Sequence, residues 1–225
     1  MTQRIPKIIH QIWYQGEEEM PECYHYFAKH LKELHPDWEY KLWTADNMIP
    51  LINQKIHDEQ PRYLFKSNIS RFEILARYGG LYIDSDFLIL KNLEPLMQNT
   101  DHVLLGNFRK GAYQVCNGFV GATPNHPLCW QMVRGLGNRS REFPEQNRYA
   151  NCIPYFDDTV KQVIPEPLII PMELFFPVHA NLVMDNQFEY SGMHYATHMF
   201  NNRHDGEGVV AHKKLPCYLR DHAYE

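Results

Sequence analysis

A helix that runs directly into a short strand ending in two aspartates is the feature that most constrains the fold of this chain. Within residues 67–78 the apolar side chains recur at helical spacing, and Gly79-Gly80 supplies the left-handed stop typical of a helix end. Residues 81–83 follow as a short buried strand. Asp84 and Asp86 come at the end of that strand, so we expect both carboxylates at the edge of a sheet.

Strand and helix patterns also alternate before this junction. Residues 7–13 are rich in β-branched and aromatic side chains between Pro6 and Gly16, which predicts a buried first strand. Residues 21–34 carry apolar side chains at helical spacing, and residues 39–43 predict a second strand. Further strands are expected at residues 88–90, 103–108, 118–122, 168–170 and 195–198. This alternation predicts an α/β fold with a Rossmann-like, mostly parallel central sheet flanked by helices.

Length and composition narrow the class of protein. The chain has 225 residues, which fits a single domain, and its formal net charge of -5 excludes the basic face that a nucleic-acid binder needs. Its five cysteines include no C-x-x-C pair, which favours a reducing compartment. The N-terminus lacks an apolar signal segment, and no apolar run approaches the roughly 18 residues of a membrane span. We therefore expect a cytoplasmic protein without an integral membrane segment in this chain; its oligomeric state is left open.

Residues 134–154 are polar and rich in Arg and Asn, without apolar periodicity. Long irregular segments of compact domains often form lids or binding loops, and solvated insertions have the same composition. The pattern predicts a loop here, either a mobile binding loop or a solvated insertion.

Asp84 and Asp86 have the spacing of metal ligands on an extended segment. Side chains at i and i+2 of extended backbone point to the same side, so both carboxylates can converge on one hard cation. Mg²⁺ or Mn²⁺ takes few protein oxygens and fills its other positions with water and phosphate oxygens, which suits a diphosphate leaving group. Most acid pairs with this spacing are solvated. This pair lies between the apolar segments 81–83 and 87–90, which favours a desolvated, functional pair.

The stretch from Ser67-Asn68 and Arg71 through Asp84-Ser85-Asp86 resembles the sugar-binding, D-x-D region of glycosyltransferase family 32. Residues 5–13 resemble the first strand of that family, and residues 41–47 resemble its second. Their order and spacing over roughly the first 100 residues are far more specific than any single motif. Shorter resemblances follow at residues 117–119, 125–127, 175–177 and 195–198.

The resemblance implies a GT-A fold and transfer of a sugar from a nucleotide-diphospho-sugar to a glycan or another hydroxyl acceptor. It also implies Mn²⁺ or Mg²⁺ as cofactor and retention of the anomeric configuration. A UDP-sugar is expected ahead of a GDP-sugar as donor. The single domain would cover residues 1–225, with the nucleotide bound by about residues 1–110 and the acceptor by about residues 111–225.

Carried over to this chain, the resemblance assigns four residues to the nucleotide and its phosphates. Trp13 would stack on the base, and Asn47 would contact the base or the ribose. Tyr82 would line the donor site, and Arg71 would reach the donor phosphate or the sugar. On composition alone Trp13 and Tyr82 would be packing residues and Arg71 a solvated one, so these roles rest on the resemblance.

The resemblance assigns a second group of residues to binding of the metal and the sugar. Asp86 would ligate the metal, and Asp84 would hold the ribose, the sugar or the metal. His198 is the candidate for a third protein ligand, although a structural role suits this histidine equally. Asn68 would bind the sugar, and the expected catalytic residues are Asp84, Asp86 and Arg71. The central residue of the retaining mechanism is left open among Asn117, Asp157 and Asp158.

Two departures from the family pattern keep other functions open. Asn68 stands where the family has Asp, and an amide lacks the charge-assisted hydrogen bond of a carboxylate. Residues 198–204 lack the Ser and Trp that follow the histidine in the family. The alternative function is a catalytically degenerate nucleotide-sugar or glycan-binding module. A D-x-D phosphoryl-transfer enzyme is a further alternative, but such sites follow the first strand and have Thr or Val where this chain has Leu88.

Overall fold

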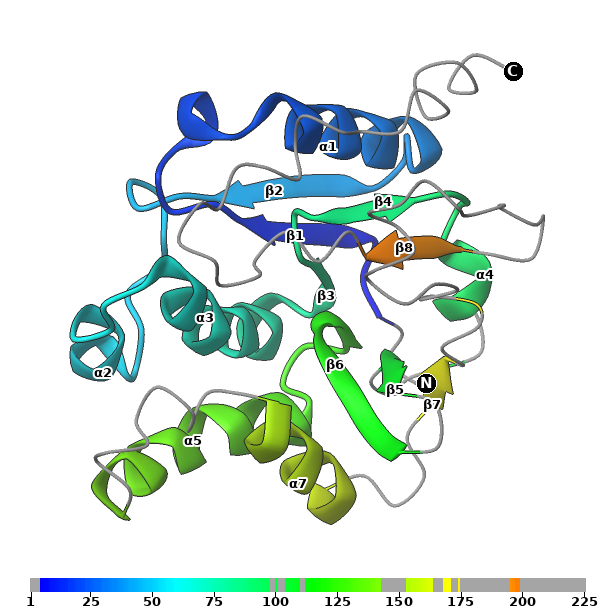
Figure 1. Cartoon of the computed structure of the whole chain (residues 1–225). Helices are drawn as coiled ribbons and strands as arrows, with labels where there is room; N and C mark the ends of the chain where they lie inside the picture. Colours follow the sequence, from blue (N-terminus) through cyan, green and yellow to red (C-terminus); the bar gives the residue numbers. More distant parts are fainter. Residues whose placement is uncertain are drawn as a thin grey trace.

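Three parallel strands form one half of a six-stranded sheet (Figure 1). The computed structural model describes residues 5–97, 100, 104–109, 112–142, 153–163, 168–170, 174 and 195–198. In it, β1 (Ile8–Ile12) pairs in parallel with β2 (Glu39–Trp43) on one side and with β3 (Gly80–Ile83) on the other. The carboxyl ends of these strands therefore meet at one edge of the sheet, where the acidic pair follows β3.

The other half of the sheet is mixed. β6 (Ala112–Ala122) lies antiparallel to both β3 and β5 (Leu104–Arg109), and β7 (Leu168–Ile170) lies parallel to β5. The strand order is β2-β1-β3-β6-β5-β7, and three of the five pairings are parallel, which confirms the mostly parallel α/β sheet. A separate two-stranded sheet joins β4 (Phe87–Ile89) to β8 (Ala196–His198) in antiparallel pairing.

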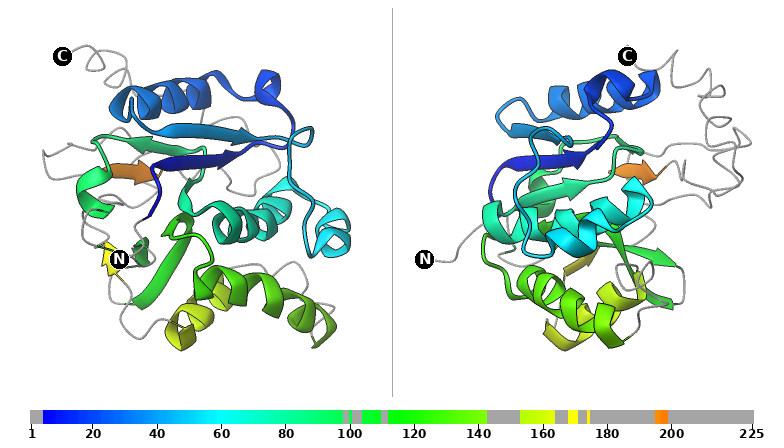
Figure 2. Two further views of the ribbon diagram at one scale, coloured as in Figure 1. Left: turned by 180° about the vertical axis from the view of Figure 1, so that it is seen from behind. Right: turned by 90° about the vertical axis from the view of Figure 1, so that its left-hand side faces the viewer.

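Helices cover both sides of this framework. α1 (Glu22–Leu34) lies on one side of the molecule, and α5 (Pro127–Glu142) and α7 (Ile153–Val163) lie on the opposite side in every view (Figures 1 and 2). α3 (Tyr63–Tyr78) packs between the sheet and α5. The shorter helices are α2 (Gln54–Asp58), α4 (Glu94–Met97) and the 3₁₀ turn Glu17–Glu19.

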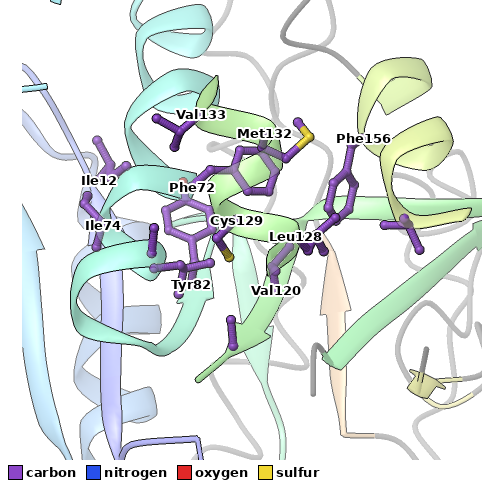
Figure 3. Packing of buried hydrophobic residues seen from close by; sticks show 14 of the residues in the cluster. Ile12, Phe72, Ile74, Tyr82, Val120, Leu128, Cys129, Met132, Val133 and Phe156 are labelled. Atoms are coloured by element: carbon purple, nitrogen blue, oxygen red, sulfur yellow. The ribbon is translucent and has the colours of Figure 1, made fainter. Parts of the chain in front are cut away.

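Alternation along β3 builds two cores, one on each face of the sheet. Tyr82 points into the core beneath α3, α5 and α7, while Leu81 and Ile83 join the core beneath α1 and β4. Figure 3 shows the first core, in which Phe72 of α3, Leu128 of α5 and Phe156 of α7 meet over Tyr82 and Val120. All of these side chains are buried. The strand that leads to the acidic pair is thus packed on both faces, which holds its end rigidly.

The expected helix end before β3 is present. Gly79 has φ +63°, and its amide donates to the carbonyl of Leu75 at 2.8 Å. A Cβ atom on Gly79 would lie 2.5 Å from the Pro124 ring, so the turn also needs a residue without a side chain. The helix itself begins at Tyr63 rather than at residue 67, one turn earlier than its apolar stripe indicates.

The predicted loop at residues 134–154 is wrong at both ends. Residues 134–142 belong to α5 and residues 153–154 to α7, and residues 143–152 lie outside the described part of the chain. The apolar side chains of α5 pack against α3 and α7, whereas Arg134 and Asn138 face solvent. Tertiary packing of one face therefore stabilises a helix whose second half is mostly polar. Among the helices that the structure describes, none is long and apolar enough to cross a membrane.

Candidate functional site

A solvent-open cleft lies at the carboxyl ends of β1 and β3, with an empty volume of about 600 Å³. One wall comes from the end of β1 and from α1, the other comes from α3, and the floor is formed by β3 and the turn after it. The lining residues of these elements are Ile12, Trp13, Tyr14, Gln15, Tyr24, Tyr63, Leu64, Ser67, Arg71, Tyr82, Asp84, Ser85 and Asp86.

The acidic pair sits in a turn and not on an extended segment, which corrects the geometry expected from the sequence. The amide of Phe87 donates to the carbonyl of Asp84 at 3.2 Å, so the chain reverses between β3 and β4. Asp84 and Asp86 nevertheless both line the cleft. The Asp84 side chain is 27% exposed and Asp86 is buried, which leaves Asp84 the more accessible of the two.

Arg71 and Tyr82 hold the carboxylate of Asp84. Oδ1 of Asp84 lies 3.2 Å from Nη2 of Arg71 and accepts a hydrogen bond from the Tyr82 hydroxyl at 2.7 Å. The Arg71 guanidinium also lies over the Tyr82 ring, 4.4 Å from its centroid. Arg71 is only 1% exposed, so it is not the solvated arginine that composition alone suggests. Three predicted site residues thus form one charged cluster, in which Arg71 and Tyr82 are buried and Asp84 is partly exposed.

The charges in this cluster shift two pKa values. Burial is the largest single effect on Arg71 and disfavours its charged form, but the surrounding acidic groups, Asp84 first among them, together outweigh burial and raise the pKa of Arg71. Burial raises the pKa of Tyr82 well above its ordinary value, and the positive charge of Arg71 only partly opposes this shift. Tyr82 therefore stays a neutral hydrogen-bond donor to Asp84, and Arg71 stays a permanent cation at the floor of the cleft.

β6 completes the support of the cluster. The amide of Asp84 donates to the carbonyl of Gly118 at 2.8 Å, and Nη1 of Arg71 donates to the carbonyl of Asn117 at 2.5 Å. Nδ2 of Asn117 donates to Oδ1 of Asn68 at 3.0 Å. Asn68 is buried on α3, outside the described set of cleft-lining residues, and its role toward the sugar stays a prediction. The structure does connect it to Arg71, through Asn117.

Trp13 lies where a base platform is expected. Its ring is partly buried, packs edge-on against Tyr24 at 5.4 Å between centroids, and lines the cleft. Its indole N–H is buried and has no hydrogen-bond partner among the described residues. An unpaired buried donor at a cleft is a group that a ligand can satisfy.

Asn47 lies apart from the cleft-lining residues of the described chain. Its Oδ1 accepts the amide of Thr44 at 2.7 Å, and its Nδ2 donates to the carbonyl of Leu42 at 3.0 Å. These bonds close the exposed turn after β2. Asp157 and Asp158 lie on α7, likewise outside that lining. Of the three candidates for the retaining mechanism, only Asn117 contacts the cluster, through its backbone carbonyl.

The donor atoms at the floor fit a hard divalent cation. Asp84 and Asp86 supply carboxylate oxygens from one turn, which suits Mg²⁺ or Mn²⁺ with few protein ligands. The backbone of His198 pairs with that of Phe87, the residue after Asp86; the His198 side chain lies outside the described part. Within the described side chains, no group of three His, Cys, Asp or Glu residues gathers around a common point. The third metal ligand therefore stays a prediction.

The cleft also contains aromatic residues that the sequence did not single out. Tyr63 is 50% exposed and stacks on Tyr14, with 5.8 Å between ring centroids. The hydroxyl of Tyr14 donates to Ser70 at 2.9 Å and lies 2.8 Å from Nε2 of His57. These residues come from the turn after β1, from α2 and from α3, so no local sequence pattern could have grouped them.

The fold is that of the GT-A glycosyltransferases. The solved structure of the PaToxG glycosyltransferase matches with a TM-score of 0.59 at 15% identity, over 72% of this chain and 71% of that one. The galactosyltransferase LgtC, in complex with donor and acceptor sugar analogs, matches with a TM-score of 0.51 at 13% identity, over 92% of this chain and 93% of that one.

Sequence comparison then gives the family. The family model of capsular polysaccharide synthesis proteins matches residues 2–155, and the chain belongs to this family. The match confirms the resemblance to glycosyltransferase family 32.

Curated relatives include three fungal proteins. Inositol phosphoceramide mannosyltransferase 3 of Schizosaccharomyces pombe is 34% identical over 138 residues, which cover 59% of this chain and 37% of the relative. Inositol phosphoceramide mannosyltransferase 2 of the same yeast is 27% identical over 218 residues, 86% of this chain and 56% of the relative. Mannosyl phosphorylinositol ceramide synthase SUR1 of Saccharomyces cerevisiae is 30% identical over 140 residues, 60% of this chain and 35% of the relative. The chain thus spans about a third to just over a half of the length of these relatives.

Proposed function

We propose that this chain is a metal-dependent glycosyltransferase that transfers a sugar from a nucleotide-diphospho-sugar to a hydroxyl acceptor with retention. The observation that carries the proposal is the arrangement of Arg71, Asp84 and Asp86 at the floor of one cleft. Carboxylates and a permanent cation at the same strand ends suit a ligand that combines a diphosphate with a divalent metal.

Each residue of the cluster has a distinct task in this mechanism. Asp86 and Asp84 would hold Mn²⁺ or Mg²⁺, with His198 as the candidate third ligand, and the bound metal would neutralise the charge developing on the departing diphosphate. Arg71 and Tyr82 fix the position of Asp84 before the donor arrives. Such preorganisation removes the cost of reorienting the carboxylate during the reaction.

The cleft wall offers the nucleotide its remaining contacts. Trp13 would stack on the base, and its free indole N–H would bond to an oxygen of the donor. Asn68 would contact the sugar, while Asn47 would reach the base or ribose only from outside the described lining. About the first 110 residues would then bind the nucleotide, and the remainder of the chain would bind the acceptor. We name no nucleophile for the retaining step.

Mannose is the sugar that the relatives favour, because all three fungal relatives are mannosyl-transferring proteins by name. The same names favour an acceptor with an inositol-type or glycan hydroxyl. The names do not specify the nucleotide of the donor. GDP-mannose therefore has to be compared with the UDP-sugars expected from the sequence.

A thermal-shift experiment tests this proposal directly. The purified chain is heated with GDP-mannose, UDP-glucose or UDP-galactose, each with and without Mn²⁺. A ligand that binds only the native state raises the melting temperature, so one donor should do so in a metal-dependent way. Without ligand, the isosteric variant Asp86→Asn should melt at the same temperature as the wild type. It should lose the metal-dependent shift that the donor causes. The proposal fails if no donor shifts the wild-type protein, or if Asp86→Asn responds to donor and metal as the wild type does.

A nucleotide-sugar binding module without turnover is the second candidate, because Asn68 replaces the carboxylate of the family and its Oδ1 is already bonded to Asn117. A donor-hydrolysis assay with Mn²⁺ separates the two functions. Slow release of free sugar from the bound donor indicates a transferase, whereas donor binding without hydrolysis or transfer indicates a binding module.

A further inference from the structure

The hydroxyl of Ser85, between the two aspartates, is buried and unpaired. Ser85 is 8% exposed, and its Oγ makes no hydrogen bond to any described residue. The side chain nevertheless lines the cleft. A buried hydroxyl without a partner destabilises the native state, so its presence in a native fold needs an explanation.

The turn itself does not explain this hydroxyl. Serines favour turns because their hydroxyls bond to nearby backbone, yet the turn from Asp84 to Phe87 is closed by backbone atoms alone. The described residues include four buried side-chain atoms without partners. Two of them, Oγ of Ser85 and Nε1 of Trp13, belong to residues that line the cleft. Unpaired polar atoms are thus concentrated at the site where a ligand would bind.

We propose that Ser85 is a further donor-binding residue, whose hydroxyl donates a hydrogen bond to an oxygen of the donor diphosphate. The inference rests on the proposed function and adds a contact to it. The carboxylates of Asp84 and Asp86 only accept hydrogen bonds, so they approach a phosphate through a metal. The Ser85 hydroxyl is a donor in the same turn, and it reaches phosphate oxygens without one.

The variant Ser85→Ala separates this role from a structural one. Because the hydroxyl has no partner in the free protein, we expect the melting temperature of the free variant to equal or exceed that of the wild type. Hydrogen bonds to charged groups are strong, so the affinity for the donor in saturating Mn²⁺ should fall about tenfold. The loss should be equal for the nucleoside diphosphate and for the complete nucleotide sugar, since both contain the contacted oxygen.

Thr159→Val is the matched control. The Thr159 hydroxyl is also buried, but it donates to the carbonyl of Tyr155 at 2.7 Å, within α7. This variant should lower the melting temperature and leave the donor affinity unchanged, the reverse of Ser85→Ala.

Three results would overturn the assignment: an unchanged donor affinity of Ser85→Ala, a lower melting temperature of the free variant, or a loss confined to the nucleotide sugar. If the wild type binds the donor and Ser85→Ala binds equally well, the inference fails while the proposed function stands. If the wild type itself binds neither nucleoside diphosphate nor nucleotide sugar, the proposed function fails and the inference falls with it.

Discussion

The carboxylate of Asp84 lies so close to Gly118 that residue 118 has no room for a side chain. A Cβ atom there would stand 2.3 Å from Oδ2 of Asp84 and 3.1 Å from Cγ. The carbonyl of the same glycine accepts a hydrogen bond from the amide of Asp84. β6 therefore restrains the first aspartate through Gly118, which is not one of the cleft-lining residues, while Arg71 and Tyr82 hold it at Oδ1.

Gly118→Ala should consequently displace the Asp84 side chain. Overpacking of this kind destabilises a protein by about 1–3 kcal/mol, and a displaced carboxylate would also weaken metal-dependent donor binding. Urea unfolding and a donor titration in Mn²⁺ measure the two effects. Gly137→Ala, within α5, is the control, because among the described residues a Cβ atom there would meet only Oδ1 of Asn53, at 3.7 Å. That helix substitution should be neutral or stabilising by about 0.5–1 kcal/mol. Wild-type donor affinity in Gly118→Ala would show that this close contact does not position Asp84.

Arg71→Lys should be far from conservative. The guanidinium bonds at once to Asp84, to the carbonyl of Asn117 and to the carbonyl of Ser67, and one ammonium cannot reproduce this fork. These acceptors are partly buried, and at least two of them lose their hydrogen bond to the guanidinium, so we expect a loss of about 2 kcal/mol in unfolding free energy. Donor affinity should fall with it. Arg77→Lys, on the same helix but away from the cleft, should leave donor affinity unchanged. Equal donor binding by Arg71→Lys and the wild type would argue against a role for the guanidinium at the donor.

Local patterns in the sequence predicted the part of the site that one short segment contains. The helix end at Gly79, the strand β3 and the two aspartates follow one another directly, so motif and topology together placed Asp84 and Asp86 at a sheet edge. Arg71 and Tyr82 were assigned through the family resemblance, because composition alone would make Arg71 a solvated residue and Tyr82 a packing residue. The turn was missed because the i, i+2 argument assumes extended backbone, whereas the chain reverses at Ser85 to start β4.

Contacts between segments that are distant in the chain could not be predicted from sequence patterns. Asn117 and Asn68 are 49 residues apart, and Tyr14 and His57 are 43 apart, so only the folded sheet brings them together. The second half of α5 was missed for a related reason. Its polar residues show no helical stripe of their own, and its apolar neighbours become significant only when α3 and α7 pack on them.

Asn68→Asp should strengthen binding of the sugar. The carboxylate would still accept the hydrogen bond from Nδ2 of Asn117, and it would offer a charge-assisted bond to a sugar hydroxyl. Such bonds are roughly twice as strong as neutral ones, so we expect an affinity gain of about 3- to 10-fold for the nucleotide sugar. The nucleoside diphosphate, which lacks the sugar, is the internal control and should bind as before. An equal change for both ligands, or no change for either, would remove Asn68 from the sugar site.

Stability should fall in mild acid because of His10. This residue is fully buried: one ring nitrogen contacts the carbonyl of Gly79 at 2.8 Å, and the other accepts from the Trp43 indole at 3.1 Å. Burial lowers the pKa of His10 to about 4, and the hydrogen bond to Gly79 only partly opposes the shift. The unfolded chain, with a pKa of about 6.5, binds the proton more tightly than the folded one.

The contribution of His10 to stability is therefore complete above about pH 6.5 and is lost as the pH falls toward 4. The loss should reach about 3 kcal/mol, and urea unfolding at a series of pH values between those limits measures it. Burial also lowers the pKa values of His30 and His35, so only the difference from a His10→Gln variant isolates this residue. That variant should be less stable at neutral pH, because Gln does not reproduce both ring contacts, and less sensitive to acid. An equal pH dependence in wild type and variant would mean that His10 does not resist protonation in the fold.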